Sequence, residues 1–227
     1  VECLLKSGLK EFQVSVGQVD YFKSLLQDAG LDTEAEENLR SLISQKNYFG
    51  VEDLVRSQNI PKNLEKAFLE LPHLFGSAEA LAKARSLTDN ICAIKAVERL
   101  EEIYEILKIY GYEKYISFDF GMLSKLQYYT GIIFQAYTYG TGEPVVKGGR
   151  YNELLKHFGK PAASIGFGLA VDNLLMALSR QKICLPKKKA PVILTYTEAN
   201  RCEAIREAQE LRSKGTSVAL RREKEDC

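Results

Sequence analysis

Residues 128–151 read YYTGIIFQAYTYGTGEPVVKGGRY, and this stretch decides the fold. Its first half is rich in β-branched and aromatic residues, which predicts a strand over residues 128–139. Residues 140–144, Gly-Thr-Gly-Glu-Pro, are turn formers, and residues 145–149 are expected to return as a second strand. The stretch therefore predicts an antiparallel hairpin, in which the neighbours Tyr128 and Tyr129 point to opposite faces.

Strand patterns also flank this hairpin. Phe12, Val14 and Val16 alternate with polar residues, and residues 116–120 repeat that alternation. Residues 163–169 form a glycine-interrupted apolar run that favours another strand. We expect one antiparallel sheet and, with the helices predicted below, an α+β fold.

Residues 18–110 show helical spacing instead. Gly30 marks the end of the first helix, Asp32 or Thr33 begins the second, and Pro61 and Ser77 begin later ones. Thr88 or Asp89 opens the longest pattern, whose buried stripe is expected to hold Ile91, Ile94, Val97, Leu100, Tyr104 and Leu107. The sequence predicts an all-helical insert between two strands of the sheet.

The end of the sequence has a different character. Residues 186–191, Pro-Lys-Lys-Lys-Ala-Pro, are typical of a linker, and a β-α-β pattern follows. We expect a core over residues 1–180, a linker over 181–191, and a small, incomplete αβ domain over 192–227. Because the sequence opens on Val1 and ends without a closing element, we expect it to be a piece of a longer or processed chain.

Composition excludes several classes of protein. The 227 residues are 45% hydrophobic and 27% charged with a net charge of +1, which fits a globular protein and gives no overall basic field for nucleic acid. No apolar run reaches the roughly 20 residues of a membrane span. The five cysteines are scattered and the histidines are two, so we expect neither a disulfide framework nor a metal site, and we place the protein in the cytoplasm.

The candidate site lies where the aromatic strands meet paired glycines. Gly148 and Gly149 permit close approach of a backbone, and Arg150 is able to hold a carboxylate or another anion. A plainer alternative is that the glycines relieve a bend and Arg150 pairs with a structural glutamate. Residue types alone therefore indicate a pocket without naming its ligand.

Three signatures resemble the catalytic core of histidyl-tRNA synthetases. Residues 122–131, MLSKLQYYTG, match the family's LVRGLDYYTG, residues 148–152, GGRYN, match GGRYD, and residues 166–173, GFGLAVDN, match GFAxGxER. The resemblance implies a class II synthetase fold. It also implies that synthetases have arginines at the positions of Ser124 and Asn173, and that these arginines hold phosphates while the adenylate forms.

This sequence departs from the synthetases at those positions. Ser124 and Asn173 carry no charge, and Gln127 replaces an acidic residue. Since losing one preorganised donor typically costs about 10²- to 10³-fold in rate, we expect adenylate formation to be lost. Asp172 also replaces a glutamate, and the whole pattern is more similar to the regulatory subunits of ATP phosphoribosyltransferase.

That second resemblance implies a regulatory protein without chemistry or cofactors of its own. It would activate the short catalytic subunit, which makes phosphoribosyl-ATP in the first step of histidine biosynthesis, and confer inhibition by histidine. We expect a dimer within a hetero-oligomer, with no tRNA and no membrane as partners. The possible histidine pocket comprises Tyr129, Tyr151, Gln127, Gly148, Gly149 and Arg150, although the family's effector site could instead lie between subunits.

Two other functions stay open at this stage. One is a histidyl-tRNA synthetase, which would need tRNA contacts that the short tail does not favour. The other is a stand-alone synthetase-like sensor or interaction module with another partner. Charging of histidine tRNA would support the first, and a gene neighbourhood without histidine biosynthesis would support the second.

Overall fold

The structure is a computed structural model that describes residues 1–58, 60–123, 128–185 and 190–223. The chain divides into two compact units, Val1–Ile183 and Cys184–Cys227, and each is described by itself. Ser124 and Gln127, which carry part of the functional argument from sequence, lie outside the described residues. The same holds for residues 186–189 of the expected linker.

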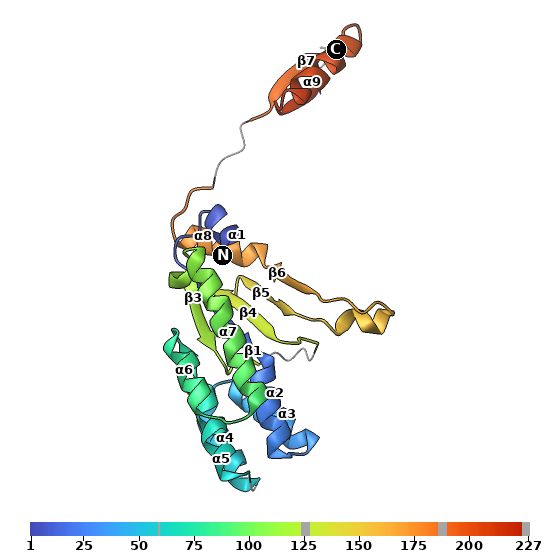
Figure 1. Ribbon diagram of the computed structural model, residues 1–227. Coiled ribbons are helices and arrows are strands. Elements are labelled where there is room, and N and C mark those ends of the chain that lie inside the picture. Colours follow the sequence, from blue (N-terminus) through green and yellow to red (C-terminus); the bar gives the residue numbers. More distant parts are fainter. Residues whose placement is uncertain (59, 124–127, 186–189, 224–227) are drawn as a thin grey trace. The chain divides into compact units, whose positions relative to one another are not determined.

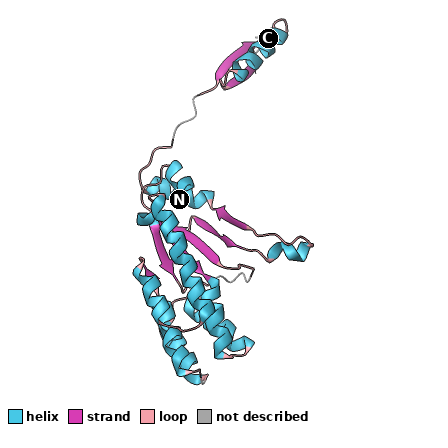
Figure 2. Cartoon of the chain, in the orientation of Figure 1, coloured by secondary structure: helices cyan, strands magenta, loops and turns pink. Residues whose placement is uncertain are grey.

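A single sheet organises the first unit (Figures 1 and 2). Within the described residues it has six strands in the order β2-β3-β1-β4-β5-β6, with bounds β1 Gln13–Gln18, β2 Phe75–Gly76, β3 Ile116–Asp119, β4 Ile132–Tyr137, β5 Val146–Arg150 and β6 Ile165–Leu169. Neighbouring strands run antiparallel except β1 and β3. The α+β class and the hairpin of β4 and β5 are confirmed.

Two details of the sheet differ from the sequence prediction. Strands β1 and β3 pair in parallel, with Val16 opposite Phe118, whereas a wholly antiparallel sheet was expected. Parallel neighbours need a long crossover connection, and the helical insert between β1 and β3 supplies one. The insert is also not entirely helical, because Phe75 and Gly76 form β2 against β3. Two residues are too few for periodicity to reveal a strand.

The insert holds six α-helices among its described residues: α2 Val19–Ala29, α3 Thr33–Ser44, α4 Tyr48–Ser57, α5 Lys62–Glu70, α6 Glu79–Ser86 and α7 Ile91–Ile109. Gly30 ends α2 in the left-handed region at φ 63°, as expected. Asp32 begins α3 and its carboxylate accepts a hydrogen bond from the Ala35 N–H at 2.8 Å. These signals place α2 and α3 as the sequence predicts.

The N-terminal caps of α6 and α7 were predicted wrongly. Asn90, rather than Thr88 or Asp89, caps α7, because its side chain accepts from the Ala93 N–H. Ala78, rather than Ser77, precedes α6 and gives no side-chain cap. Neighbouring polar residues compete for a cap position, and only the local backbone conformation selects one of them.

The buried stripe of α7 also differs from its prediction. Ile91 is 69% exposed, whereas Ala93, Ala96, Val97 and Leu100 are buried. The two alanines let α7 approach α2 closely. Apolar spacing alone overlooked these small residues because they add little hydrophobicity to the pattern.

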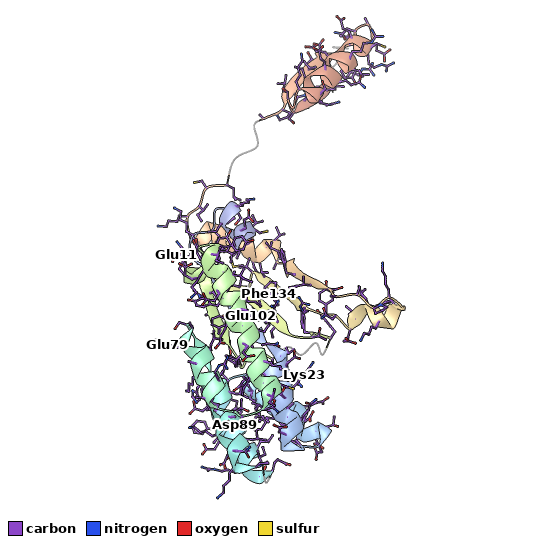
Figure 3. All side chains as sticks on the ribbon, in the orientation of Figure 1. Glu11, Lys23, Glu79, Asp89, Glu102 and Phe134 are labelled. Atoms are coloured by element: carbon purple, nitrogen blue, oxygen red, sulfur yellow. The ribbon has the colours of Figure 1, made fainter. Side chains whose placement is uncertain are left out.

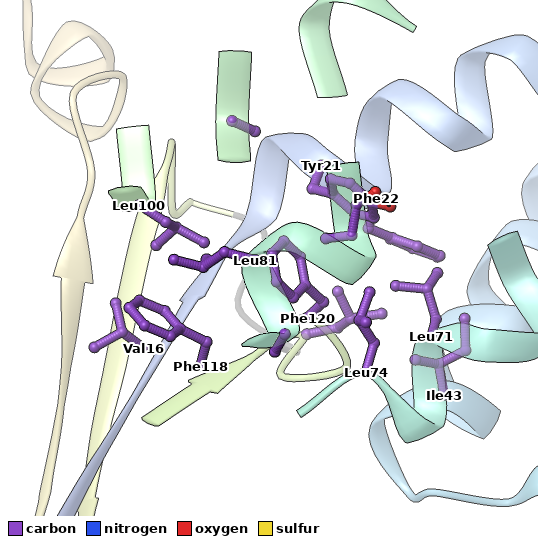
Figure 4. Close-up of a cluster of buried hydrophobic side chains, with 14 of the residues drawn as sticks. Val16, Tyr21, Phe22, Ile43, Leu71, Leu74, Leu81, Leu100, Phe118 and Phe120 are labelled. Carbon is purple, nitrogen blue, oxygen red and sulfur yellow. Dashed lines mark hydrogen bonds between the residues drawn. The ribbon is translucent and has the colours of Figure 1, made fainter. Parts of the chain in front are cut away.

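One continuous core joins the insert to the sheet (Figure 4). Val16 and Phe118 of the sheet contribute to the same cluster as Leu100 of α7 and Phe22 of α2. Tyr21 is 1% exposed, and its hydroxyl donates to the Ala84 carbonyl at 2.9 Å. Burial raises the pKa of Tyr21, so the phenol stays neutral where it joins α2 to α6.

The register of the strands divides the sheet into two faces. Residues paired across antiparallel strands share a face, and successive residues alternate between faces. The face that contacts α7, called the α7 face, carries Val14, Val16, Ile132, Phe134 and Arg150. The opposite face, called the glycine face, carries Ser15, Gly17, Ile133, Gly149 and Gly166.

Shorter elements complete the first unit. They are α1 Glu2–Lys6, α8 Val171–Arg180, and the 3₁₀ turns η1 Leu71–His73, η2 Glu113–Tyr115 and η3 Leu154–Phe158. Gln181, just after α8, accepts hydrogen bonds from the Lys10 and Glu11 N–H groups at 2.9 and 3.2 Å. These bonds tie the end of α8 to the segment that enters β1.

The second unit has the β-α-β order that the sequence predicts. Its elements are β7 Val192–Tyr196, α9 Arg201–Ser213 and β8 Val218–Arg222, and the two strands pair in parallel. Ala204 and Ala208 of α9 and Val218 of β8 are buried, so these elements pack on one another. In the part of the chain that the structure describes, no helix combines the length and apolarity needed to cross a membrane.

Replacement of Phe118 tests the joint core. Phe118 is 1% exposed, and its ring meets the Tyr104 ring edge-on at 5.5 Å. We expect Phe118→Ala to lower the free energy of unfolding by about 3–5 kcal/mol, because it leaves a cavity between the sheet and α7. Urea denaturation followed by circular dichroism measures this change.

The matched control for this prediction is Phe49→Ala. Phe49 is 81% exposed, so its truncation should change the free energy of unfolding by less than about 0.5 kcal/mol. Equal losses in the two variants would contradict the assignment of Phe118 to the core.

Candidate functional site

Three tyrosines gather beside the hairpin of β4 and β5. The Tyr128 and Tyr129 rings lie 4.4 Å apart, and the Tyr151 ring meets the Tyr128 ring at 5.9 Å and 85°. The sequence predicted that Tyr128 and Tyr129 lie in a strand and face opposite ways, which is wrong. They precede β4, which begins at Ile132, and both rings join one cluster.

The turn at Gly131 explains this arrangement. Its φ of 110° lies in the region that favours glycine, so the chain turns there before it enters β4. The Val19 N–H donates to the Gly131 carbonyl at 3.0 Å and holds the turn against the start of α2. A strand prediction from β-branched and aromatic composition does not detect a single turn residue of this kind.

Glycines in the neighbouring strands allow the rings to lie on the sheet itself. A Cβ atom at Gly149 would lie 2.8 Å from the Tyr129 ring and from the Ile132 carbonyl oxygen. One at Gly166, which pairs with Gly149, would lie 2.7 Å from the Tyr151 hydroxyl oxygen. The glycine face therefore has a bare backbone floor under two of the tyrosines.

Backbone hydrogen bonds fix the segments that carry the tyrosines. The Thr130 N–H donates to the Arg150 carbonyl at 2.8 Å, and the Asn152 N–H donates to the Thr130 hydroxyl at 2.9 Å. The Tyr151 N–H donates to the Ser164 carbonyl at 2.8 Å. The Lys23 ammonium of α2 donates to the Tyr129 carbonyl at 3.3 Å and so connects the helical insert to the site.

The environment keeps the Tyr129 phenol neutral. Burial, helped by a hydrogen bond with Tyr128 and by the neighbouring Tyr128 and Tyr151 phenols, raises the pKa of Tyr129 to about 12. A protonated phenol donates one hydrogen bond and accepts others, and its ring attracts cations and stacks on planar groups. The cluster is therefore suited to hold a small ligand with a ring, an amine or both.

Polar side chains continue along the glycine face. The Ser15 and Ser117 hydroxyls are 3.0 Å apart, and the Tyr137 hydroxyl donates to the side-chain amide oxygen (Oε1) of Gln135 at 2.5 Å. Burial, followed by the charge of Asp119, raises the pKa of Tyr137. Among the described residues, no group of three or more His, Cys, Asp or Glu side chains is placed to hold a metal ion.

Arg150 and Gly148 do not join the tyrosines. Arg150 follows Gly149 in β5, and its side chain lies on the α7 face beside Ile132 and Phe134. A Cβ at Gly148 would lie 2.5 Å from Phe167 Cβ and 2.7 Å from the Phe134 ring, also on the α7 face. Of the site residues predicted from sequence, the structure thus brings together Tyr129, Tyr151 and Gly149.

Two members of the cluster were missed by the sequence analysis. Tyr128 was expected to face away from Tyr129, and Gly166 was treated as an interruption of a strand. The pairing of Gly166 with Gly149 makes it part of the floor. Glycines spaced as in residues 148–149 and 166–168 are a signal for this floor only when their strands are known to pair in register.

Asn173 has a structural partner. It lies in the first turn of α8, and its side-chain amide donates to the Pro144 carbonyl at 3.3 Å. Pro144 ends the turn of the β4–β5 hairpin. Asn173 therefore holds α8 against the hairpin and supplies no positive charge.

Comparison with known proteins identifies relatives for nearly the whole chain. The sequence profile of the family described as histidyl-tRNA synthetase matches residues 1–174. Proteins named ATP phosphoribosyltransferase regulatory subunit are 38% identical in Acetivibrio thermocellus and 39% identical in Thermoanaerobacter pseudethanolicus, each over 97% of this chain. The matched region is 53% and 58% of those relatives, so the chain spans a little over half of their length.

Solved structures with the same fold bear related names. An ATP phosphoribosyltransferase regulatory subunit/histidyl-tRNA synthetase from Bacillus halodurans C is 32% identical, with a TM-score of 0.78 over 97% of this chain and 56% of that one. A histidyl-tRNA synthetase from Nostoc is 20% identical with a TM-score of 0.73, over 99% of this chain and 56% of that one. The second likeness concerns the fold alone. The class II synthetase-like core expected from the signatures is confirmed.

Gly149→Ala tests the glycine floor. The added Cβ would meet the Tyr129 ring and a backbone carbonyl at 2.8 Å, so the ring or the strand has to shift. We expect a loss of about 1–3 kcal/mol in the free energy of unfolding and a changed near-ultraviolet dichroism of the tyrosines. Denaturant titration and circular dichroism measure the two effects.

Gly168→Ala is the matched control in the neighbouring strand. A Cβ at Gly168 meets nothing within 4 Å, so this variant should keep both the stability and the tyrosine spectrum. The floor would be refuted if Gly149→Ala behaved in the same way as its control.

Proposed function

Since the chain belongs to the histidyl-tRNA synthetase family, we propose that it is a non-catalytic, regulatory member of that family. It serves as a regulatory subunit of ATP phosphoribosyltransferase in the first step of histidine biosynthesis, in the cytoplasm. Its partner is the short catalytic subunit, which joins ATP and phosphoribosyl pyrophosphate to give phosphoribosyl-ATP and pyrophosphate. The protein activates that subunit, makes it sensitive to histidine, and self-associates as a dimer within the complex.

The names of the relatives support this proposal. The regulatory-subunit relatives align with nearly all of this chain, including the tail beyond the residues that the synthetase profile matches. A solved complex of ATP phosphoribosyl transferase from Thermotoga maritima has the same fold, at 20% identity, a TM-score of 0.53, and coverage of 70% of this chain and 53% of that one. The names of the regulatory-subunit relatives therefore support regulation rather than aminoacylation.

Asn173 is the observation that carries the proposal. The resemblance to synthetases assigns its position to an arginine that holds the phosphates of ATP. Here a neutral amide stands there and already donates to the Pro144 carbonyl at 3.3 Å. A neutral group with a structural partner offers no charge-assisted contact to a phosphate, so adenylate formation lacks one of its supports.

The tyrosine cluster is the proposed histidine site. Tyr129 and Tyr151 lie over the backbone of Gly149 and Gly166. The Tyr128 ring packs against both of their rings, at centroid distances of 4.4 and 5.9 Å. Phenol rings and hydroxyls suit an imidazole and an ammonium group, which histidine combines. A site that binds the amino acid without activating it fits a sensor. Histidine then regulates if it binds two states of the complex with different affinity.

The direct test measures phosphoribosyl-ATP formation by the short catalytic subunit of the same organism. We expect the protein to raise the rate, and histidine to lower it again only when the protein is present. We expect no histidine-dependent exchange of pyrophosphate into ATP by the protein alone, because it lacks the arginine contacts. The regulatory function would be overturned if the protein did not raise the rate and the two proteins eluted separately. Charging of histidine tRNA by the protein would also overturn it.

Calorimetry tests the histidine site separately. The double variant Tyr129→Ala with Tyr151→Ala should weaken histidine binding by about tenfold or more, because it removes both rings over the glycine floor. Tyr139→Ala is the control, since Tyr139 is 52% exposed and outside the cluster, and should keep the affinity. Equal histidine affinity in all three proteins would show that the effector binds elsewhere, such as between subunits, without refuting the regulatory function.

A further inference from the structure

One side chain of the helical insert reaches the tyrosine cluster. Lys23 lies in the second turn of α2, where Figure 3 labels it, and is half-buried. Its ammonium donates to the Tyr129 carbonyl at 3.3 Å, although 106 positions separate the two residues in the sequence. Holding a long lysine side chain on one backbone carbonyl costs rotamer entropy. A contact of this kind constrains both of the segments that it joins.

The peptide unit between Tyr129 and Thr130 is held from both sides. Its carbonyl accepts from Lys23 of α2, and its N–H donates to the Arg150 carbonyl of β5 at 2.8 Å. Because a peptide unit is planar, hydrogen bonds at its two opposite ends fix its orientation. This one unit is therefore a bridge between the helical insert and the strand that carries the glycine floor.

The orientation of that unit decides where the Tyr129 ring lies. The ring packs so closely on the floor that a Cβ at Gly149 would be 2.8 Å from it, and its centroid is 4.4 Å from that of the Tyr128 ring. A rotation of the peptide unit would lift the ring from Gly149 or press it against Tyr128. Lys23 thus acts on the position of the ring through the backbone.

Helix α2 is well anchored, so it gives Lys23 a fixed base. The neighbours Tyr21 and Phe22 are buried, and the Phe22 ring meets the Phe68 ring of α5 edge-on at 6.3 Å. The Tyr21 hydroxyl bonds to the Ala84 carbonyl of α6. A displacement of α2 relative to the sheet would therefore change the bond between Lys23 and the tyrosine cluster.

We propose that Lys23 is a positioning residue, which holds the Tyr129 ring on the glycine floor and so sets the affinity of the tyrosine cluster for histidine. The inference rests on the proposed histidine site. Since coupling is reciprocal, a ligand that requires this ring position also strengthens the contact of α2 with the cluster. The bond between Lys23 and Tyr129 is then the route by which histidine binding reaches the helical insert.

The first test observes this hydrogen bond in the ligand-free protein. With ¹³C at tyrosine carbonyls and ¹⁵N at threonine amides, a carbonyl-to-amide NMR spectrum detects only tyrosines that precede threonine, which in this sequence are residues 129–130, 137–138 and 196–197. The peak that Tyr129→Phe removes belongs to Tyr129. We expect Lys23→Met to move this peak and to leave the other two in place. An unmoved Tyr129 peak would overturn the proposal.

The second test measures histidine affinity by calorimetry. Lys23→Met keeps an unbranched apolar stem and removes the ammonium, so it should weaken binding about fivefold, the factor that corresponds to one hydrogen bond. Lys23→Arg should stay within about twofold of the wild type, because a single bond to a carbonyl is neither bidentate nor stacked. Lys95→Met, at an exposed lysine of α7, is the matched control and should keep the affinity. Thermal unfolding checks that each variant is folded.

The outcomes separate the positioning role from the histidine site. Wild-type affinity in Lys23→Met, or equal losses in Lys23→Met and Lys95→Met, would overturn the positioning role. If the double variant Tyr129→Ala with Tyr151→Ala still lost affinity in that case, the histidine site would stand. Equal affinity of the wild type and the tyrosine double variant would overturn the histidine site, and with it the role of Lys23 in binding.

Discussion

The register between β4 and β5 is the constraint on which the rest of the structure depends. Gly149 lies opposite Ile133 on the glycine face, and Gly148 lies opposite Phe134 on the α7 face. A shift by one residue would exchange the two faces of β5, place Arg150 under the tyrosines and bury Lys147 among apolar residues. The same register therefore separates the tyrosine cluster from the Arg150 side chain on the α7 face, although Gly149 and Arg150 are adjacent residues of one strand.

The helical insert makes this sheet possible and connects it to the site. It provides the crossover that lets β1 and β3 pair in parallel, and its buried side chains join those of the sheet in one core. At the other side of the sheet, Lys23 of α2 donates to the Tyr129 carbonyl. A change in how α2 packs would thus alter the backbone of the tyrosine cluster, which is the kind of physical connection that coupling between two sites requires.

The chemistry of the site and the departures from the synthetase signatures both favour ligand binding over adenylate formation. Neutral phenols over a glycine floor are suited to holding a small ring or amine. Asn173, where the resemblance assigns a phosphate-holding arginine, instead serves to join α8 to the hairpin. Both observations agree with the proposal that the chain binds a small ligand without activating it.

The sequence by itself determined the described strands other than β2, most helix positions, the small β-α-β unit and the family, because periodicity, caps and the GGRY and YYTG signatures are local features. It also proposed Tyr129, Tyr151 and Gly149 as members of one site, and the structure places these three residues together. Only the tertiary structure placed Tyr128 beside Tyr129 through the turn at Gly131, added Gly166 to the floor, and turned Arg150 to the opposite face. Those outcomes depend on turn conformation and strand register, which arise from contacts between distant residues and leave no local pattern.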